Sequence, residues 1–381
     1  MNEIIKAQER IKEVVEMQLE RLKKMKENAQ PVDYKSKEKI IIGTVGGDGI
    51  GPTITAEAVK ILEKLLKSDI EKGRIEIRNI DDLTIENRLK VGKAIPDEIL
   101  EKLLACDVIL KGPTTTPEKT DATQNIESAN VAMRKALDLF ANVRPVKVPE
   151  LGIDWTFFRE NTEGAYAVGN MGIDVNDDLA IDFTITTTTG SERIIRKAFE
   201  YARANGKTRV SAVTKANVIK ATDGKFLEVC KRISAEYPEI NYDSWYMDII
   251  TAKLIDDKRR RDFQVFVLPN LYGDILTDEA AEIQGGVGTA GSANVGTKYA
   301  MFEAIHGSAP RMVTEGRAQY ADPSSIIKAG AMLLNHIGYI EESDKLEKAL
   351  EISNSSESKV KMTGRDGAVA SEKAEYIMSL L

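Results

Sequence analysis

The chain has 381 residues, 42% of them apolar and 30% charged, a composition typical of a globular protein with two domains or one elaborated α/β unit. No apolar run approaches the ~18 residues needed to cross a bilayer, so we expect no membrane span. The net charge of −7 and the pI near 5.3 disfavour a nucleic-acid-binding surface, although a local basic pocket for a small anion is compatible with them.

Cysteine and histidine are scarce, with Cys106, Cys230, His306 and His336 as the whole complement. This scarcity argues against a zinc site. We expect both cysteines to be buried and reduced in a cytoplasmic protein. Any essential metal should therefore be Mg²⁺ or Mn²⁺ bound by carboxylate oxygens.

Residues 1–29 predict an amphipathic helix, and "QPVDYKSKEK" after them predicts a linker. The helix carries six glutamates, which is unlike a transit peptide, so a packing or oligomer-contact arm is favoured. The apolar side chains expected on one stripe are Ile4, Ile11, Val15, Leu19 and Leu22.

From Lys39 the pattern is strand, glycine turn and helix, over "KIIIGTVGGDGIGP" and "TITAEAVKILEKLL". The runs in "DVILKGP", "RVSAVTKAN" and "FQVFVLPN" predict further buried strands, each followed by a polar loop, as in an α/β fold. Ligands bind such sheets beyond the carboxyl ends of the strands. The β-prone segment "DLAIDFTITTTTGSERIIRKAFEYA" predicts a two-stranded arm that pairs with a partner subunit.

The glycines of "GGDGIGP" do not match the dinucleotide-binding fingerprint, because Pro52 stands where the third glycine belongs. Two interpretations stay open. The turn approaches a cofactor, or it is a tight structural turn.

Polar and cationic residues gather in two stretches of the sequence. "LKGPTTTPEKTDATQNIESANVAMRKALDLFANVRP" carries Ser128, Asn130, Arg134 and Arg144, and "FFRENTEGAYA" adds Arg159. Three convergent arginines suit a small polycarboxylate, because guanidinium binds carboxylate through two charge-assisted hydrogen bonds. The alternative is a set of separate surface salt bridges.

Acid/base and metal-binding candidates are less specific. Tyr166 and Lys215 are candidates for proton transfer, and Lys215 alone is more often a solvated charge. Asp248, Asp274 and Asp278 are the carboxylates best placed for a divalent ion. Asp274 and Asp278 stand four residues apart, so on a helix they share a face and repel each other unless a cation lies between them; two solvated acids are the alternative.

Together these pieces resemble the isocitrate/isopropylmalate dehydrogenase family over about residues 39–370. The motifs, in order, are "GDGIGP", "KGPTTTP", "SANVAMRKALDLFANVRP", "RENTEGAY", "TKANVIKATDG", "NLYGDILTDEAAEIQGG" and "FEAIHGSAP". The resemblance implies that family's α/β fold, with large and small domains around a central cleft that holds the active site. The implied division is an extension over 1–38, a large domain over 39–133 plus 283–381, and a small domain over 134–282 with a dimer-clasp arm at about 163–190.

By position, the resemblance implies oxidative decarboxylation of a 2-hydroxy acid by a homodimer, or a higher oligomer, with shared active sites. Tyr166 and the partner's Lys215 match the acid/base pair, and Asp274 and Asp278 match metal ligands completed by Asp248 of the partner subunit. The remaining matches are substrate-binding Ser128, Asn130, Arg134, Arg144, Arg159 and Lys111, and cofactor-binding Thr115, Thr116, Asn217, Glu303, His306, Gly307, Arg311 and Asp322.

Ser128 and Asn130 favour isocitrate as substrate, because an alkyl group against them would leave their polar atoms unpaired. Two features bear on the coenzyme: Arg311 suits the 2′-phosphate of NADP, whereas Met312 and "TGRDGAVAS" resemble NAD-using members, which slightly favours NAD. The alternatives are a 3-isopropylmalate, homoisocitrate or tartrate/malate-type enzyme, or a non-catalytic regulatory subunit.

Overall fold

The computed structural model describes residues 3–26, 30–116, 126–169, 171–286, 288 and 290–381. Residues 1–2 and 27–29 of the predicted N-terminal helix and residues 117–125 of the hydroxyl-rich loop lie outside the described residues. The chain forms two compact units. Unit 1 is Met1–Gln30 with Phe140–Ala280, and unit 2 is Pro31–Leu139 with Ala281–Leu381.

Unit 2 contains a mixed sheet with strand order β2-β1-β3-β12-β11, in which only the β11–β12 pair is antiparallel. Its strands are β1 (Ile40–Val45), β2 (Ile75–Asn79), β3 (Val108–Lys111), β11 (Gly291–Val295) and β12 (Ala300–Ala304). Its helices are α2 (Gly51–Leu65), α3 (Lys67–Glu71), α4 (Ile85–Val91), α5 (Asp97–Leu104), α6 (Ala129–Ala136), α11 (Pro310–Thr314), α12 (Ser324–His336), α13 (Ile340–Asn354) and α14 (Ala370–Leu380).

Helices cover both faces of this sheet. Helices α2 and α12 contact one face, and side chains of α5 and α6 pack with Val45, Ile109 and Met301 on the other. Successive residues of a strand point to opposite faces, so β1 needs apolar side chains at nearly every position. The continuous run "KIII" therefore predicted a strand buried on both sides, and β1 confirms it.

Unit 1 contains five sheet strands in the order β4-β5-β10-β8-β9, with β4 antiparallel to β5 and the other pairs parallel. Its strands are β4 (Ala141–Val148), β5 (Ile153–Glu160), β8 (Arg209–Thr214), β9 (Asn241–Tyr246) and β10 (Val265–Leu268). Its helices are α1 (Glu3–Lys26), α7 (Thr188–Ala204), α8 (Thr222–Ser234), α9 (Met247–Leu254) and α10 (Asn270–Gln284), the last continuing into unit 2.

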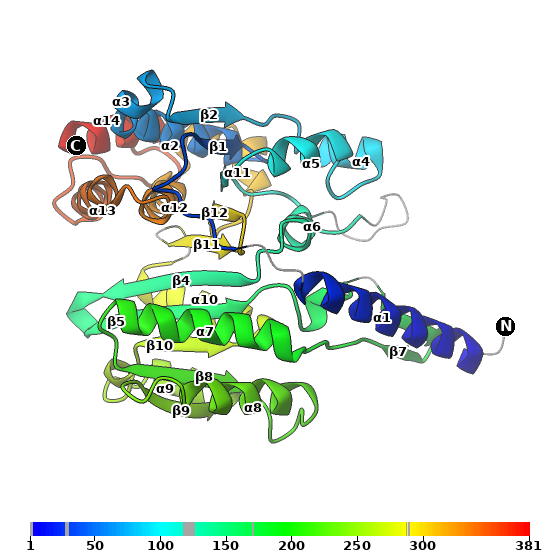
Figure 1. The fold of residues 1–381 in the computed structure, drawn as a ribbon. Coiled ribbons are helices and arrows are strands. Elements are labelled where there is room, and N and C mark those ends of the chain that lie inside the picture. Colours follow the sequence, from blue (N-terminus) through cyan, green and yellow to red (C-terminus); the bar gives the residue numbers. More distant parts are fainter. Residues whose placement is uncertain (1–2, 27–29, 117–125, 170, 287, 289) are drawn as a thin grey trace. The chain divides into compact units, whose positions relative to one another are not determined.

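Helices α7 and α8 lie against β5, β10 and β8 (Figure 1), and their apolar faces form the core of unit 1 with Phe158, Val210 and Val267. The predicted strands "RVSAVTKAN" and "FQVFVLPN" are confirmed as β8 and β10. Cys230 lies in this core and Cys106 in that of unit 2, both as buried free thiols, as expected.

A two-stranded antiparallel hairpin, β6 (Ile173–Asn176) with β7 (Leu179–Ile181), stands where the sequence predicts the arm. The threonines that prompted the prediction are not in these strands: Thr187 accepts a hydrogen bond from the backbone of Gly190 and caps α7 instead. A hydroxyl at that position satisfies a backbone amide that the helix leaves unpaired.

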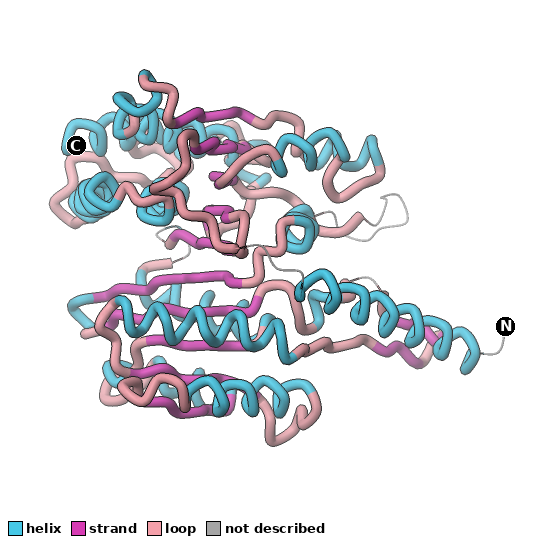
Figure 2. Tube along the Cα trace, in the orientation of Figure 1, coloured by secondary structure: helices cyan, strands magenta, loops and turns pink. Residues whose placement is uncertain are grey.

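Helix α1 runs beside this hairpin as one continuous helix (Figure 2). Its predicted apolar stripe is not the face that packs, since Ile11, Val15 and Leu19 are 46–55% exposed. The buried face is one step round the helix, with Val14 at 2% and Met25 at 4% exposure. Apolar periodicity predicted the helix correctly, and within a single chain the predicted stripe stays exposed, as an oligomer-contact arm allows.

No helix within the described ranges is both long enough and apolar enough to span a membrane.

Candidate functional site

The densest cluster of predicted site residues lies in unit 1, at the end of β5 and the start of α10. Arg159 is the penultimate residue of β5, and its guanidinium forms an ion pair with Oδ1 of Asp274. The hydroxyl of Tyr166 donates to the other oxygen of Asp274 at 2.7 Å, and the Arg159 guanidinium lies 5.3 Å from the Tyr166 ring centre. Arg159 and Tyr166, two residues predicted separately, therefore converge on one carboxylate.

Arg144 links the two aspartates of α10. Its Nη1 donates to Asp278 at 2.9 Å, and its Nη2 lies 3.8 Å from Asp274. The sequence predicted that these carboxylates repel each other unless a divalent ion is bound. The structure adds a cation that this expectation did not include, because Arg144, which is 7% exposed, offsets part of their charge from within the same chain.

Neighbouring side chains orient both arginines. Thr277 accepts from Arg144 Nη1 at 2.5 Å, and Asn270 Oδ1 accepts from Nε and Nη2 of Arg159 at 2.9 and 2.7 Å. A Cβ at Gly273 would lie 2.6 Å from the Cβ of Arg159, so only glycine leaves room for the arginine there. The result is a pair of buried cations held in fixed positions beside Asp274 and Asp278.

Lys215 and Asp248 form a separate pair in unit 1. Lys215 follows β8, Asp248 opens α9, and Lys215 Nζ donates to Asp248 Oδ1 at 2.5 Å. This hydrogen bond lowers the pKa of Asp248. Asp223 accepts from the backbone N–H of Lys215 at 2.6 Å, and burial raises the pKa of Asp223.

Carboxylate oxygens are the ligands that Mg²⁺ and Mn²⁺ prefer, and Asp278 is 59% exposed at its side chain, so a cation can reach the α10 pair. Within the described residues, however, no three His, Cys, Asp or Glu side chains gather as a metal cage. Asp248 does not join Asp274 and Asp278 inside one chain. The α10 pair fits a divalent ion as an incomplete ligand set.

In unit 2, Arg134 and Lys111 meet at Glu303 in the interior. Glu303 accepts from Arg134 at 3.2 Å, Lys111 at 3.3 Å and Asn294 at 2.7 Å. Burial raises the pKa of Glu303, but the two cations and Asn294 more than offset this and lower it to about 2. Burial lowers the pKa of Lys111, which is 0% exposed and also donates to the carbonyl of Gly112 at 2.9 Å. Both cations predicted to bind substrate from this unit are therefore held by a buried carboxylate.

The loops after β1, β3 and β12 meet at the carboxyl ends of these parallel strands. Gly47 and Gly49 have φ of +73° and +62°, and a Cβ on either would overlap a backbone carbonyl, that of Pro113 or Ser308. The turn "GGDGIGP" is thus packed between its neighbouring loops, and the protein's own backbone requires both glycines. Asp48 closes the group by accepting from the backbone N–H of Thr115 at 2.7 Å.

Hydroxyl groups line the same loops. The Thr115 and Ser308 hydroxyls are hydrogen-bonded at 2.7 Å, and Thr114 donates to Asn130 at 2.9 Å. Ser128 occupies the N-cap position of α6 but makes no capping bond. Thr116, Asn217 and Gly307 are exposed loop residues.

His306 Nδ1 lies 3.0 Å from the carbonyl of Gly307, while Nε2 is buried with no hydrogen-bond partner among the described residues. A buried orphan ring nitrogen beside hydroxyls and glycine turns fits a nucleotide ligand, whose polar atoms would satisfy it.

Arg311 and Asp322, both predicted to bind the coenzyme, are each paired with a neighbouring charged side chain. Arg311 is 84% exposed at its side chain and donates to Glu315 at 2.5 Å, while Arg317 pairs with the same carboxylate. Asp322 instead accepts from the backbone N–H of Ser324 at 2.9 Å at the start of α12, and it lies 3.5 Å from the Lys373 ammonium.

Sequence reasoning missed the residues that hold the site together, namely Asp48, Asn270, Gly273 and Thr277, and the buried Glu160 and Glu163. The position of Asn270 directly after the strand "FQVFVLPN" was a usable signal, because side chains at strand ends reach the ligand side of a sheet. Glu160 and Glu163 gave no such signal, since exposed and buried glutamates look alike in a sequence.

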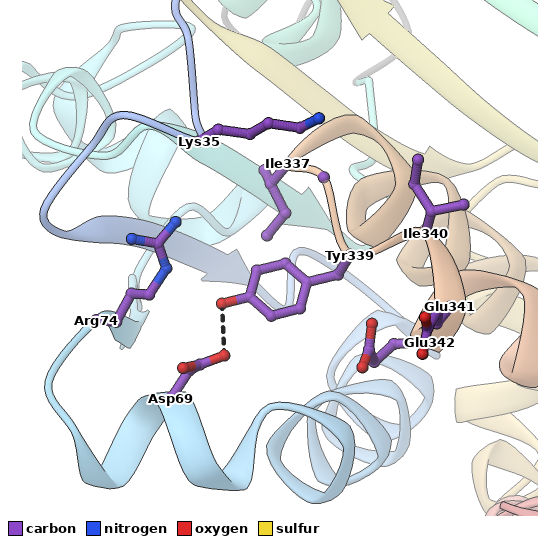
Figure 3. A pocket seen from close by; sticks show the side chains of 9 residues that line it. Lys35, Asp69, Arg74, Ile337, Tyr339, Ile340, Glu341 and Glu342 are labelled. Carbon is purple, nitrogen blue, oxygen red and sulfur yellow. Dashed lines mark hydrogen bonds between the residues drawn. The ribbon is translucent and has the colours of Figure 1, made fainter.

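A surface pocket of about 440 Å³ lies elsewhere in unit 2, lined by residues 337–342 together with Lys35, Asp69 of α3 and Arg74 (Figure 3). Tyr339 points into it and donates to Asp69 at 2.8 Å; burial, and then this bond, raise the pKa of Tyr339 to about 12. None of the predicted site residues lines this pocket.

Comparison with known proteins identifies the family. The model of the family described as isocitrate/isopropylmalate dehydrogenase matches residues 41–372. The homoisocitrate dehydrogenase of Methanocaldococcus jannaschii is 39% identical over 323 residues, covering 81% of this chain and 88% of that protein. The 3-isopropylmalate dehydrogenase of Archaeoglobus fulgidus is 38% identical over 320 residues, covering 82% and 90%.

Among solved structures, the isocitrate dehydrogenase from Methylococcus capsulatus superposes with a TM-score of 0.77 at 34% identity, covering 90% of this chain and 99% of that one. The chain belongs to the isocitrate/isopropylmalate dehydrogenase family, which confirms the resemblance and the α/β fold expected from the sequence. It is a decarboxylating dehydrogenase of the isocitrate, isopropylmalate or homoisocitrate type, and members of the family use NAD(P) and a divalent metal.

Proposed function

We propose that the protein catalyses the NAD(P)-dependent oxidative decarboxylation of isocitrate to 2-oxoglutarate. The observation that carries the proposal is the cluster in which Arg144, Arg159 and Tyr166 contact Asp274 and Asp278. It combines cations for substrate carboxylates, a hydroxyl for proton transfer and oxygens for a divalent cation in one set of contacts.

Isocitrate, rather than a substrate with an alkyl arm, is supported by Ser128 and Asn130. Both side chains are polar and partly exposed in the structure. An isopropyl group packed on them would displace water without replacing its hydrogen bonds, whereas a third carboxylate would accept from them.

The predicted site residues divide the tasks of this reaction among them. Arg134, Arg144 and Arg159 bind substrate carboxylates, and the contacts to Thr277 and Asn270 hold the last two in place before binding. Lys215 of the partner subunit takes the proton of the substrate hydroxyl, and Tyr166 gives a proton to the carbon left by decarboxylation. A divalent cation held by Asp274, Asp278 and Asp248 of the partner subunit would polarise the substrate oxygen, and NAD(P) would accept the hydride.

For the coenzyme we propose NAD⁺, because Arg311 is already paired with Glu315 and its neighbour is Met312. NADP⁺ is the second candidate, because Arg311 and Arg317 both contact Glu315. Arg365 lowers the pKa of Glu315 further. The three arginines carry more positive charge than the single carboxylate of Glu315 offsets. A 2′-phosphate could take up that excess. The ratio of kcat/KM values for the two coenzymes decides between them.

We further propose a cytoplasmic homodimer with shared active sites. The ion pair of Lys215 with Asp248 supports this, because it lets one subunit present a proton-transfer group and a metal ligand as a unit. Size measurement by light scattering, together with mixing of inactive Lys215→Met and Asp274→Asn chains, tests it: shared sites restore part of the activity in mixed dimers.

Steady-state kinetics of the isolated chain with Mg²⁺ tests the proposed function. The substrates to compare are isocitrate, homoisocitrate, 3-isopropylmalate, malate and tartrate, each with both coenzymes. We expect the highest kcat/KM with isocitrate and stoichiometric release of CO₂ and 2-oxoglutarate. A higher value with another acid would replace isocitrate, and absence of turnover with all five would favour the regulatory-subunit alternative.

A further inference from the structure

Two carboxylates are buried within the segment from Arg159 to Tyr166. Glu160 and Glu163 are each 2% exposed. Glu160 accepts from the backbone N–H groups of Thr162 at 3.0 Å and Glu163 at 2.5 Å, and Glu163 accepts from the backbone N–H of Thr187 at 2.9 Å. Burial, and then repulsion by Glu163, raise the pKa of Glu160 to about 7. Two adjacent buried acids need compensating charge.

Helix α1 supplies a cation to this pair. Arg21 Nη1 lies 3.2 Å from Glu163 Oε1, and Arg21 Nη2 donates to the Thr162 hydroxyl at 2.9 Å. The side chain of Arg21 is 24% exposed, so the ion pair is largely withdrawn from water and more effective than a surface pair. Helix α1 contacts β6 of the same unit, and Val14 and Met25, on either side of Arg21 in the sequence, are buried.

A chain of hydrogen bonds connects this ion pair to the candidate site. The backbone carbonyl of Glu163 accepts from Asn270 Nδ2 at 3.0 Å, and Asn270 Oδ1 accepts from Arg159. Arg159 in turn contacts Asp274. Displacement of Glu163 would therefore move the amide that orients Arg159.

We propose that α1 is a positioning element of this site, in which Arg21 neutralises the buried Glu160/Glu163 pair and thereby fixes the segment from Arg159 to Tyr166 against α10. The family model matches residues 41–372, so helix α1, which would support the site, precedes the matched part of the chain. The kinetic part of the test rests on the proposed function, and the structural part does not.

The experiment compares Arg21→Ala, Glu163→Gln and the double variant with wild type. The matched control is Arg10→Ala, which removes an exposed ion pair with Glu13 from the same helix. For Arg21→Ala we expect kcat/KM for isocitrate to fall at least ~10-fold with KM raised, because a misplaced Arg159 weakens carboxylate binding. Adding Glu163→Gln removes the uncompensated charge and should restore kcat/KM to within about threefold of the Glu163→Gln single variant.

Hydrogen exchange of the Thr162, Glu163 and Thr187 amides gives a readout that needs no activity. These amides donate to the two carboxylates, so their exchange should quicken at least ~10-fold in Arg21→Ala, recover in the double variant and stay unchanged in Arg10→Ala. If the amide exchange rates and the kcat/KM of Arg21→Ala equal those of Arg10→Ala, the inference is overturned. Wild-type inactivity together with the expected exchange pattern would remove the proposed function and leave the inference standing.

Discussion

Glu303 illustrates how one residue determines both charge balance and stability. It is the anion shared by two buried cations, Lys111 and Arg134. Its folded-state pKa of about 2 lies below the ordinary 4.5, so the stability it contributes is present above pH ~4.5 and is lost as the pH falls toward 2. The difference between the ordinary pKa of 4.5 and the folded-state pKa of about 2 corresponds to about 3 kcal/mol of folding stability.

We therefore predict that Glu303→Gln destabilises the protein by about 3–5 kcal/mol at pH 7, because it leaves two cations buried without an anion. The stability difference from wild type should shrink as the pH is lowered from about 4.5 toward 2. Urea unfolding at pH 7, 4.5 and 3 measures this. Glu13→Gln at the exposed ion pair with Arg10 is the control and should leave the curve almost unchanged, and a pH-independent difference for Glu303→Gln would contradict the assignment.

Arg144 bridges the two aspartates proposed to bind metal, so its loss should have a larger effect than its single positive charge suggests. Arg144→Met removes the contacts to Asp278 and Thr277 and restores the repulsion between Asp274 and Asp278. We expect kcat/KM for isocitrate to fall about 100-fold, as for loss of a charge-assisted contact of about 3 kcal/mol. Kinetics with Arg259→Met, which alters an exposed pair, provide the baseline, and equal values for both variants would refute the role of Arg144.

At the scale of elements, α10 carries both aspartates and also makes room for Arg159 through Gly273. We predict that Gly273→Ala costs about 1–3 kcal/mol and lowers kcat/KM, because the new methyl group overlaps the base of the arginine side chain. Gly224→Ala in α8 is the matched control: it meets open space, and alanine favours the helix, so it should stabilise by about 0.5–1 kcal/mol. Thermal unfolding and kinetics of both variants test this difference. Equal stability and equal kcat/KM for Gly273→Ala and Gly224→Ala would contradict the prediction.

At the scale of the whole molecule, ligand binding should couple to stability. Isocitrate with Mg²⁺ at about 100 times its Kd adds about 2.7 kcal/mol to the folded state, a rise in Tm of a few degrees. We predict this rise for wild type and its loss in Asp278→Asn, which removes a proposed metal ligand. Calorimetry with and without ligand measures it, with 3-isopropylmalate as the comparison ligand. An equal rise with both acids would contradict the proposed selectivity.

The sequence by itself determined the buried strands, the α/β class and the family. Continuous apolar runs such as those of β1, β8 and β10 leave few other places for their side chains than a sheet covered on both faces. It also predicted the chemistry of the candidate residues, because arginine, aspartate and tyrosine have few alternative roles when their motifs occur in order.

Only the tertiary structure decided which of these residues meet and which face each helix buries. The i,i+4 spacing placed Asp274 and Asp278 on one helix face but could not reveal that Arg144 joins them, since Arg144 lies on a distant strand. The exposed stripe of α1 has the same cause: Ile11, Val15 and Leu19 are as apolar as the residues that pack, and Arg21 must reach Glu163. Sequence patterns specify local conformation, whereas contacts between distant segments depend on where the whole chain brings them.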